Sequence, residues 1–166
     1  MKIALSTDHT GFEQLKDLKK YLEEELGHEC VDYGPQALNI NDDYPDYIFK
    51  AAEAISNGEC QMGIIMGGSG QGEAMAANRL KGVRCAVFYG PTVVGRLIDV
   101  NGRVSSSPYE IVRLSREHNN SNMLSIAARF VSLLDMKHVV KLWLETPFSE
   151  QPRHVRRIDK LDRIGS

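Results

Sequence analysis

Short apolar runs alternate with amphipathic segments along this chain, and this alternation limits the possible folds more than any other feature. The run MGIIMGG at residues 62–68 is continuously apolar, as a strand buried inside a parallel sheet is. Residues 11–26 instead have helical periodicity, with lysine and glutamate opposite an apolar face made by Phe12, Leu15, Leu18, Leu22 and Leu26. Strands and helices that alternate in this way form α/β folds.

The same patterns recur along the chain and predict a complete topology. Strands are expected at residues 2–7, 28–34, 62–68, 83–90 and 122–129, and helices at 11–26, 45–58, 72–80, 110–120, 134–145 and 153–164. This order predicts a doubly wound, parallel five-stranded sheet with helices on both faces. A chain of 166 residues without an internal repeat is expected to form one domain, 1–166.

Residues 90–107 interrupt this rhythm. Asn101-Gly102 stands between the segments LIDV and RVSS, and such a dipeptide between two apolar-containing runs is a strong signal for a two-residue turn. We therefore predict an inserted β-hairpin near 90–107, beside the rim formed by the strand ends.

Composition excludes several classes of function. The net charge of −2 favours neither nucleic acid nor an anionic membrane surface as a partner, and no apolar run is long enough to cross a bilayer. The opening segment MKIALSTDH is too short and too soon polar for a signal peptide. Cys30, Cys60 and Cys85 have no metal-like spacing, which favours reduced core thiols in a cytoplasmic protein.

Ligands of doubly wound folds bind beyond the carboxyl ends of the strands, and glycine-rich and charged residues gather there. Gly68, Gly70 and Gly72 have the spacing G-x-G-x-G, and no Gly-Lys-Ser follows. This pattern is neither the dinucleotide fingerprint nor a Walker loop, so a flavin- or nicotinamide-binding module is disfavoured. Glycine backbone can still approach an anion closely, although a simple tight turn gives the same pattern.

The charged residues at these positions each have a structural and a functional interpretation. Glu73 is either a common first-turn acid or a general base beside an anion site. The pair Asp8-His9 is either a helix cap or a ligand for a polyol. His118 taken alone is more often structural. Arg153 and Arg157 share a helix face, which is either solvated or a fork for phosphate.

Together these motifs resemble the ribose-5-phosphate isomerase B family, which includes the galactose-6-phosphate isomerase subunits. The matching stretches keep the order and spacing of that family and cover nearly the whole chain apart from residues 90–107: DHTGFEQLK (8–16), DYP (43–45), GGSGQGEAMAANR (67–79), GVRCAV (82–87), SREHNNSNMLSIAAR (115–129) and RHVRRID (153–159).

The resemblance implies a Rossmann-like sheet and an aldose–ketose isomerase of phosphorylated sugars that needs neither metal nor cofactor. It implies a homodimer, or a tetramer, whose active sites take residues from both subunits. The family roles fall on the following positions: Asp8 and His9 contact the sugar; the loop from Gly68 through Ser69, Gly70 and Gln71 to Gly72 holds the enediolate; His118 helps to open the sugar ring; Asn119 binds a hydroxyl; and Arg129, Arg153 and Arg157 hold the phosphate.

The catalytic base distinguishes two branches of this family. Many members have a cysteine base at the position of Gly67, whereas a second branch uses the glutamate at the position of Glu73. This chain has the pair Gly67 and Glu73, so the resemblance implies Glu73 as the base.

Three functions remain open from the sequence. The leading hypothesis is interconversion of ribose 5-phosphate and ribulose 5-phosphate, and the second is isomerisation of a tetrose or hexose phosphate. The third is a non-catalytic regulator that binds a sugar phosphate. Residues 90–107, which family members usually lack, are expected to affect the pocket mouth, the dimer contact or the substrate size.

Overall fold

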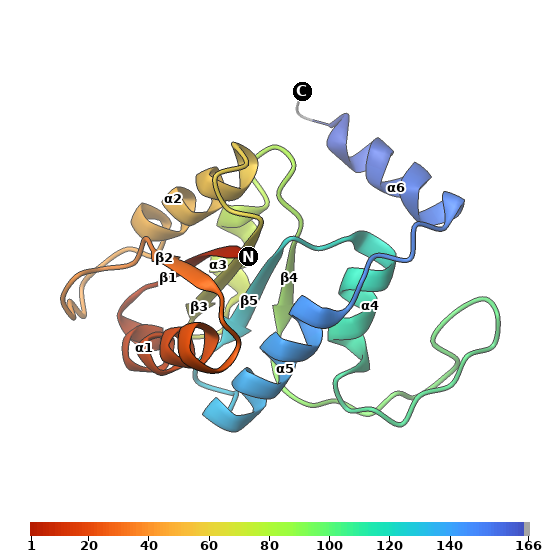
Figure 1. Ribbon diagram of the computed structural model, residues 1–166, viewed down its shortest axis with the longest axis horizontal. Helices are drawn as coiled ribbons and strands as arrows, with labels where there is room; N and C mark the ends of the chain where they lie inside the picture. The colour runs from red at the N-terminus through yellow and green to blue at the C-terminus, as the bar shows by residue number, and fades with distance from the viewer. Residues whose placement is uncertain (165–166) are drawn as a thin grey trace.

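Five parallel strands form the single sheet of the computed structural model, which describes residues 1–164. The strands are β1 (Lys2–Thr7), β2 (Glu29–Asp32), β3 (Met62–Gly67), β4 (Cys85–Phe88) and β5 (Met123–Ala127). Their order across the sheet is β2-β1-β3-β5-β4, and every neighbouring pair is parallel. The order reverses after β1, as it does in doubly wound folds. Because all the strands are parallel, their carboxyl ends lie along one edge (Figure 1).

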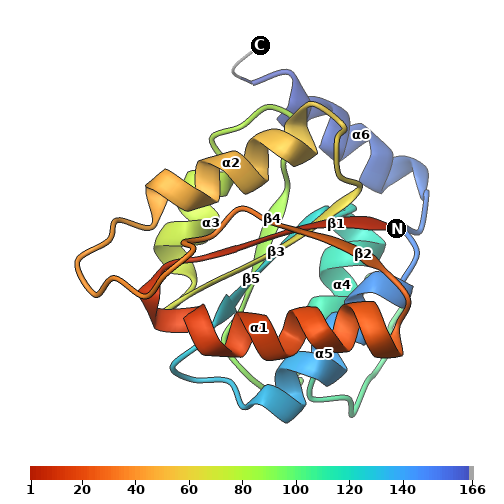
Figure 2. The same cartoon turned by 60° about the vertical axis from the view of Figure 1, so that its left-hand side comes forward.

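Helices cover both faces of this sheet (Figure 2). The helices are α1 (Phe12–Lys20), α2 (Pro45–Ser56), α3 (Gln71–Ala77), α4 (Glu110–Asn119), α5 (Leu133–Glu145) and α6 (Pro152–Asp162). A 3-10 turn at His9–Gly11 precedes α1 and a π-helical turn at Tyr21–Glu25 follows it. The predicted helix over residues 11–26 is therefore one continuous segment with three local geometries.

Alternation of side chains along the strands divides the core into two layers. Ile64 on β3 belongs to the layer that packs against α1, α4 and α5, where Trp143 is fully buried. Its neighbour Ile65 belongs to the layer that packs against α2 and α3. Both layers are apolar because the strands are covered on both sides, which is why their sequences are continuously apolar. The prediction of a doubly wound parallel sheet is confirmed.

The segment 90–107 differs from its prediction. The turn is present, because Gly102 has φ +79° and the Ile98 amide donates to the Arg103 carbonyl at 2.8 Å. However, no strand forms on either side of it, so the predicted β-hairpin is wrong. Figure 1 shows the segment as a loop that extends beyond α4.

A lack of buried apolar surface explains this difference. The apolar side chains that flank the turn, Val93, Leu97, Val100 and Val104, are 62–91% exposed. A two-stranded hairpin without an apolar face to bury is marginal in water. The loop is held through charge instead, since Arg103 forms ion pairs with Glu117 at 2.5 Å, Asp99 at 3.3 Å and Glu110 at 3.7 Å.

Helix α6 lies at the amino ends of the strands, opposite the edge where ligands of this fold class bind (Figures 1 and 2). It packs against α4, whose last turn leads into the start of β5. None of the helices within residues 1–164 is long and apolar enough to cross a membrane.

Candidate active site

The side chain of Glu73 fills the space that a side chain at residue 67 would need. A Cβ atom built on Gly67 would lie 1.8 Å from Glu73 Oε1 and 2.0 Å from its Cδ. These separations are far inside van der Waals contact, so Glu73 can hold this position only because residue 67 is glycine. Gly67 ends β3 and Glu73 lies in the first turn of α3, which places the carboxylate at the carboxyl edge of the sheet.

The surroundings of Glu73 at this edge change the pKa of its side chain. The residue is only 4% exposed, and burial raises the pKa of its carboxyl group. Its own backbone amide lowers that pKa again, and the negative charge of Asp8 raises it. A raised pKa makes the carboxylate a stronger base, which suits a group that removes a proton from carbon.

The glycine loop between β3 and α3 is held in one conformation. Gly70 has a left-handed φ of +72°, and its carbonyl accepts a hydrogen bond of 2.6 Å from the buried hydroxyl of Ser125. At Gly72, a Cβ atom would lie 2.8 Å from the ring of Tyr44. Ser69 and Gln71 are exposed on the outside of this loop. The close contacts leave glycine as the residue that fits at both positions.

Two neighbouring elements bring charged groups to the same edge. Arg129 follows β5, and its guanidinium carbon lies 3.5 Å from the place of a Cβ atom on Gly68. Asp8 follows β1 and is 93% buried; it caps the next turn by accepting a 2.8 Å hydrogen bond from the Thr10 amide. The structure therefore brings together Asp8, the glycine loop, Glu73 and Arg129, as the sequence predicts.

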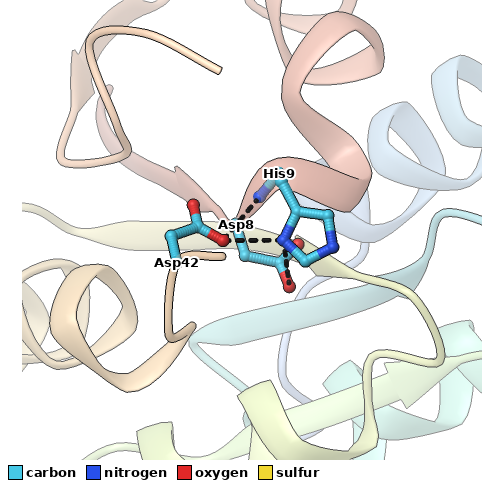
Figure 3. A group of neighbouring side chains, drawn as sticks. All are labelled: Asp8, His9 and Asp42. Atoms are coloured by element: carbon cyan, nitrogen blue, oxygen red, sulfur yellow. Dashed lines mark hydrogen bonds and ion pairs between the residues drawn. The ribbon is translucent and has the colours of Figure 1, made fainter. Parts of the chain in front are cut away.

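His9 is the next residue, and it contacts a residue that the sequence did not single out (Figure 3). Its Nδ1 atom lies 2.7 Å from Asp42 Oδ1 and 3.8 Å from Asp8 Oδ2. The Asp42 side chain is only 2% exposed and comes from the loop before α2.

Asp8, His9 and Asp42 are also the one group within residues 1–164 whose ligand atoms lie close enough together to hold a metal ion. In the structure the His9 and Asp42 atoms of this group bond to each other, and Asp8 Oδ1 bonds to the Thr10 amide. These polar contacts account for the cluster without a metal ion, and chemistry without metal or cofactor stays a prediction.

The remaining predicted residues form a second group, at the end of the sheet where α6 lies. The ring of His118, near the end of α4, is 4.3 Å from the ring of His154 in α6. Arg153 donates through Nε to His154 Nε2 at 3.1 Å, and the Ser149 hydroxyl lies 2.7 Å from the other ring nitrogen. Asn119 and Arg157 are exposed beside these side chains.

The surroundings of His154 favour its neutral form. Burial lowers its pKa, and the charges of His118, Arg153 and Arg157 lower it further. A neutral ring can accept the hydrogen bond from Arg153 and so orient the guanidinium. The sequence did not predict this role, because a histidine inside a basic segment gives no sign of its partners.

The two groups lie at opposite ends of the sheet within one chain. Strand β5 has five residues and so separates its ends by roughly 15 Å. Arg129 lies at the carboxyl edge, whereas Arg153 and Arg157 lie at the other. One chain thus does not assemble the predicted three-arginine phosphate site.

The three cysteines do not offer an alternative base. Burial raises the pKa of Cys30 to about 12 and also raises the pKa of Cys60 and of Cys85. Thiols with raised pKa values stay protonated at neutral pH and are inert as bases or nucleophiles. Glu73 is thus the better candidate for a base.

Comparison with known proteins identifies the family. A model of the family described as Ribose/Galactose Isomerase matches residues 3–102 and 104–161. This chain belongs to the ribose/galactose isomerase family.

Named relatives agree with this assignment. Ribose-5-phosphate isomerase B of Mycolicibacterium paratuberculosis is 34% identical over 161 residues, which cover 97% of this chain and 89% of that protein. The fold matches ribose-5-phosphate isomerase B of Clostridium thermocellum with a TM-score of 0.83 at 34% identity, covering 99% of this chain and 97% of that one. It also matches the Mycoplasma genitalium enzyme with bound ribulose-5-phosphate, with a TM-score of 0.81 at 32% identity over 98% and 94% of the two chains.

Because the charge of Glu73 is buried, we expect its removal to stabilise the fold although the residue is the candidate base. Because its pKa is raised in the folded protein, ionisation of Glu73 destabilises the fold as pH rises above the ordinary value of 4.5. Glu73→Gln is therefore expected to melt at a higher temperature than the wild type at pH 8, with about 2–4 °C for each kcal/mol gained. The difference should disappear below pH 4.5, where both side chains are neutral. Melting curves across this pH range check it, and a variant that is less stable at pH 8 would contradict it.

Proposed function

We propose that this protein is an aldose–ketose isomerase that interconverts ribose 5-phosphate and ribulose 5-phosphate through an enediolate, with Glu73 as the base. The observation that carries the proposal is the buried Glu73 carboxylate in the space left by Gly67, beside the glycine loop. The named relatives are ribose-5-phosphate isomerases, and this chain matches them over nearly their whole length, which supports ribose 5-phosphate as the substrate.

The reaction moves one proton from carbon 2 to carbon 1 and a second proton from the oxygen on carbon 2 to the oxygen on carbon 1. Glu73 takes the proton from carbon 2 of the open-chain aldose, and negative charge grows on the carbonyl oxygen. The loop from Gly68 to Gly72 lies beside Glu73, and its amides and the Ser69 hydroxyl stabilise that charge. Glu73 then returns the proton to carbon 1, and the hydroxyl proton of carbon 2 passes to the oxygen on carbon 1, which gives the ketose. A carboxylate of raised pKa is a suitable acceptor and donor for both steps.

The other residues bind the two ends of the sugar. Asp8 and His9 contact its hydroxyl groups near Glu73, and Gln71 lies on the same loop. His118 moves the proton that opens the sugar ring, because histidine is the side chain most often used for general acid–base catalysis. Asn119 binds a hydroxyl, and Arg129, Arg153 and Arg157 hold the phosphate. Binding the phosphate fixes the reacting carbons in place against Glu73.

The separation of the two groups supports a site shared between subunits. We propose that Asp8, His9, the glycine loop, Glu73 and Arg129 come from one subunit. His118, Asn119, Arg153 and Arg157 then come from the partner of a homodimer. A two-fold axis can bring opposite ends of two identical sheets together, which one chain cannot do. The proposal includes one isomerase domain along the chain and a cytoplasmic location.

A substrate panel tests the proposed reaction. We expect kcat/KM to be highest for ribose 5-phosphate and lower for erythrose 4-phosphate and galactose 6-phosphate, because the placement of phosphate against Glu73 depends on chain length. Initial rates of ketose formation measure this. Highest turnover of a tetrose or hexose phosphate would replace the substrate, and binding without turnover of any aldose phosphate would favour a non-catalytic regulator.

Mixed dimers test the shared site. Co-assembly of Glu73→Gln chains with Arg153→Ala/Arg157→Ala chains should restore about a quarter of wild-type activity, since half of randomly paired dimers then have one intact site of two. Co-assembly of Glu73→Gln with His9→Ala is the matched control and should restore none, because both residues belong to the same subunit's group. Equal recovery in the two mixtures, or none in the first, would contradict the arrangement.

A further inference from the structure

Within residues 1–164, the Asp42 side chain makes its polar contacts with a single residue, His9. Its Oδ1 atom lies 2.7 Å from the His9 ring nitrogen Nδ1 and accepts a 3.3 Å hydrogen bond from the His9 backbone amide. One carboxylate oxygen therefore fixes both the backbone and the ring of the same residue. The His9 side chain remains 29% exposed, whereas that of Asp42 is 2% exposed.

This contact determines which ring nitrogen of His9 carries the proton. An ionised carboxylate can only accept, so Nδ1 is the donor in this pair. Because the second nitrogen lies on the side of the ring away from Asp42, it stays available to a ligand (Figure 3). In the neutral ring that nitrogen, Nε2, is then an acceptor for a hydroxyl group.

A purely structural role accounts poorly for Asp42. Its second oxygen, Oδ2, is buried and has no hydrogen-bond partner among the described residues, 1–164. A buried, unpartnered carboxylate oxygen costs stability, so a residue kept only for folding would be better replaced by a neutral side chain. A buried charge that touches one half-exposed histidine is instead the arrangement that orients a functional imidazole.

We propose that Asp42 is a positioning residue that holds His9 in the Nδ1–H tautomer, with Nε2 presented to a hydroxyl group of the sugar phosphate. This inference rests on the proposed function for the identity of the ligand, but the tautomer of His9 does not depend on it. Asp42 acts through His9 and does not itself touch the substrate.

The tautomer is tested first, in the ligand-free protein. Long-range proton–nitrogen NMR spectra of uniformly 15N-labelled protein, at a pH where the ring is neutral, distinguish the two tautomers, and His9→Ala assigns the His9 signals among the five histidines. We expect Nδ1–H in the wild type and a shift toward the Nε2–H form in Asp42→Ala. A predominant Nε2–H form in the wild type, or an unchanged tautomer in Asp42→Ala, would overturn the proposal even if the isomerase activity is correct.

A double-mutant cycle tests the functional consequence. Asp42→Ala should lower kcat/KM about tenfold, mainly through a higher KM, and should cause no further loss in a His9→Ala background. Asn41→Ala, an exposed residue of the same loop, is the matched control and should leave kcat/KM and melting temperature unchanged.

The melting temperature of Asp42→Ala distinguishes a role of Asp42 in positioning His9 from a role in folding. We expect the melting temperature of Asp42→Ala to stay near that of the wild type, because losing the contacts with His9 is offset by removing a buried oxygen that has no partner within residues 1–164. An equal loss of kcat/KM in both His9 backgrounds would mean that Asp42 does not act through His9, and would overturn the proposal. Absence of any isomerase activity in the wild type would refute the proposed function and leave the NMR result to decide the tautomer.

Discussion

The candidate active site depends on the missing side chain of Gly67. Glu73 occupies the volume that any larger residue would need, and the apolar interior beside it raises the pKa of its carboxyl group. Close contacts constrain the loop around the carboxylate. Gly70 is left-handed and its carbonyl accepts a hydrogen bond from the Ser125 hydroxyl, and Gly72 packs against Tyr44. The proposal that Glu73 is the base thus rests on a close contact between two residues that are six positions apart.

The parallel sheet imposes the second constraint. All strands end at one edge, so Glu73, Asp8 and Arg129 meet there, while the turn from α4 into β5 leaves His118 at the opposite end. The segment 90–107 reaches that opposite end, where Arg103 pairs with Glu117, the neighbour of His118. The ion pairs of Arg103 therefore connect this loop to α4, next to the residues that we propose bind the phosphate.

The fold could be predicted because buried strands and helices leave apolar patterns in the sequence. Contacts between residues far apart along the chain leave no such pattern and could not be predicted. Strands such as β3 were predictable because burial on both faces leaves a continuous apolar run. The hairpin prediction was wrong because Asn101-Gly102 reports only local turn geometry, and exposed valines cannot stabilise flanking strands. Asp42 was missed because its partner His9 is 33 positions away, and only the folded loop brings the two together. The residues of the proposed site were found through family resemblance, and their division between two ends of the sheet required the structure.

We propose that the Glu73 carboxylate, in the space left by Gly67, removes the proton from carbon 2 of the substrate. Incubation of ribose 5-phosphate with the protein in D2O, followed by NMR of the recovered sugar phosphates, measures this transfer directly. We expect deuterium incorporation at the reacting carbons by the wild type, and a rate at least about 10²-fold lower for Glu73→Gln with substrate binding retained. Incorporation by Glu73→Gln at the wild-type rate would contradict the claim.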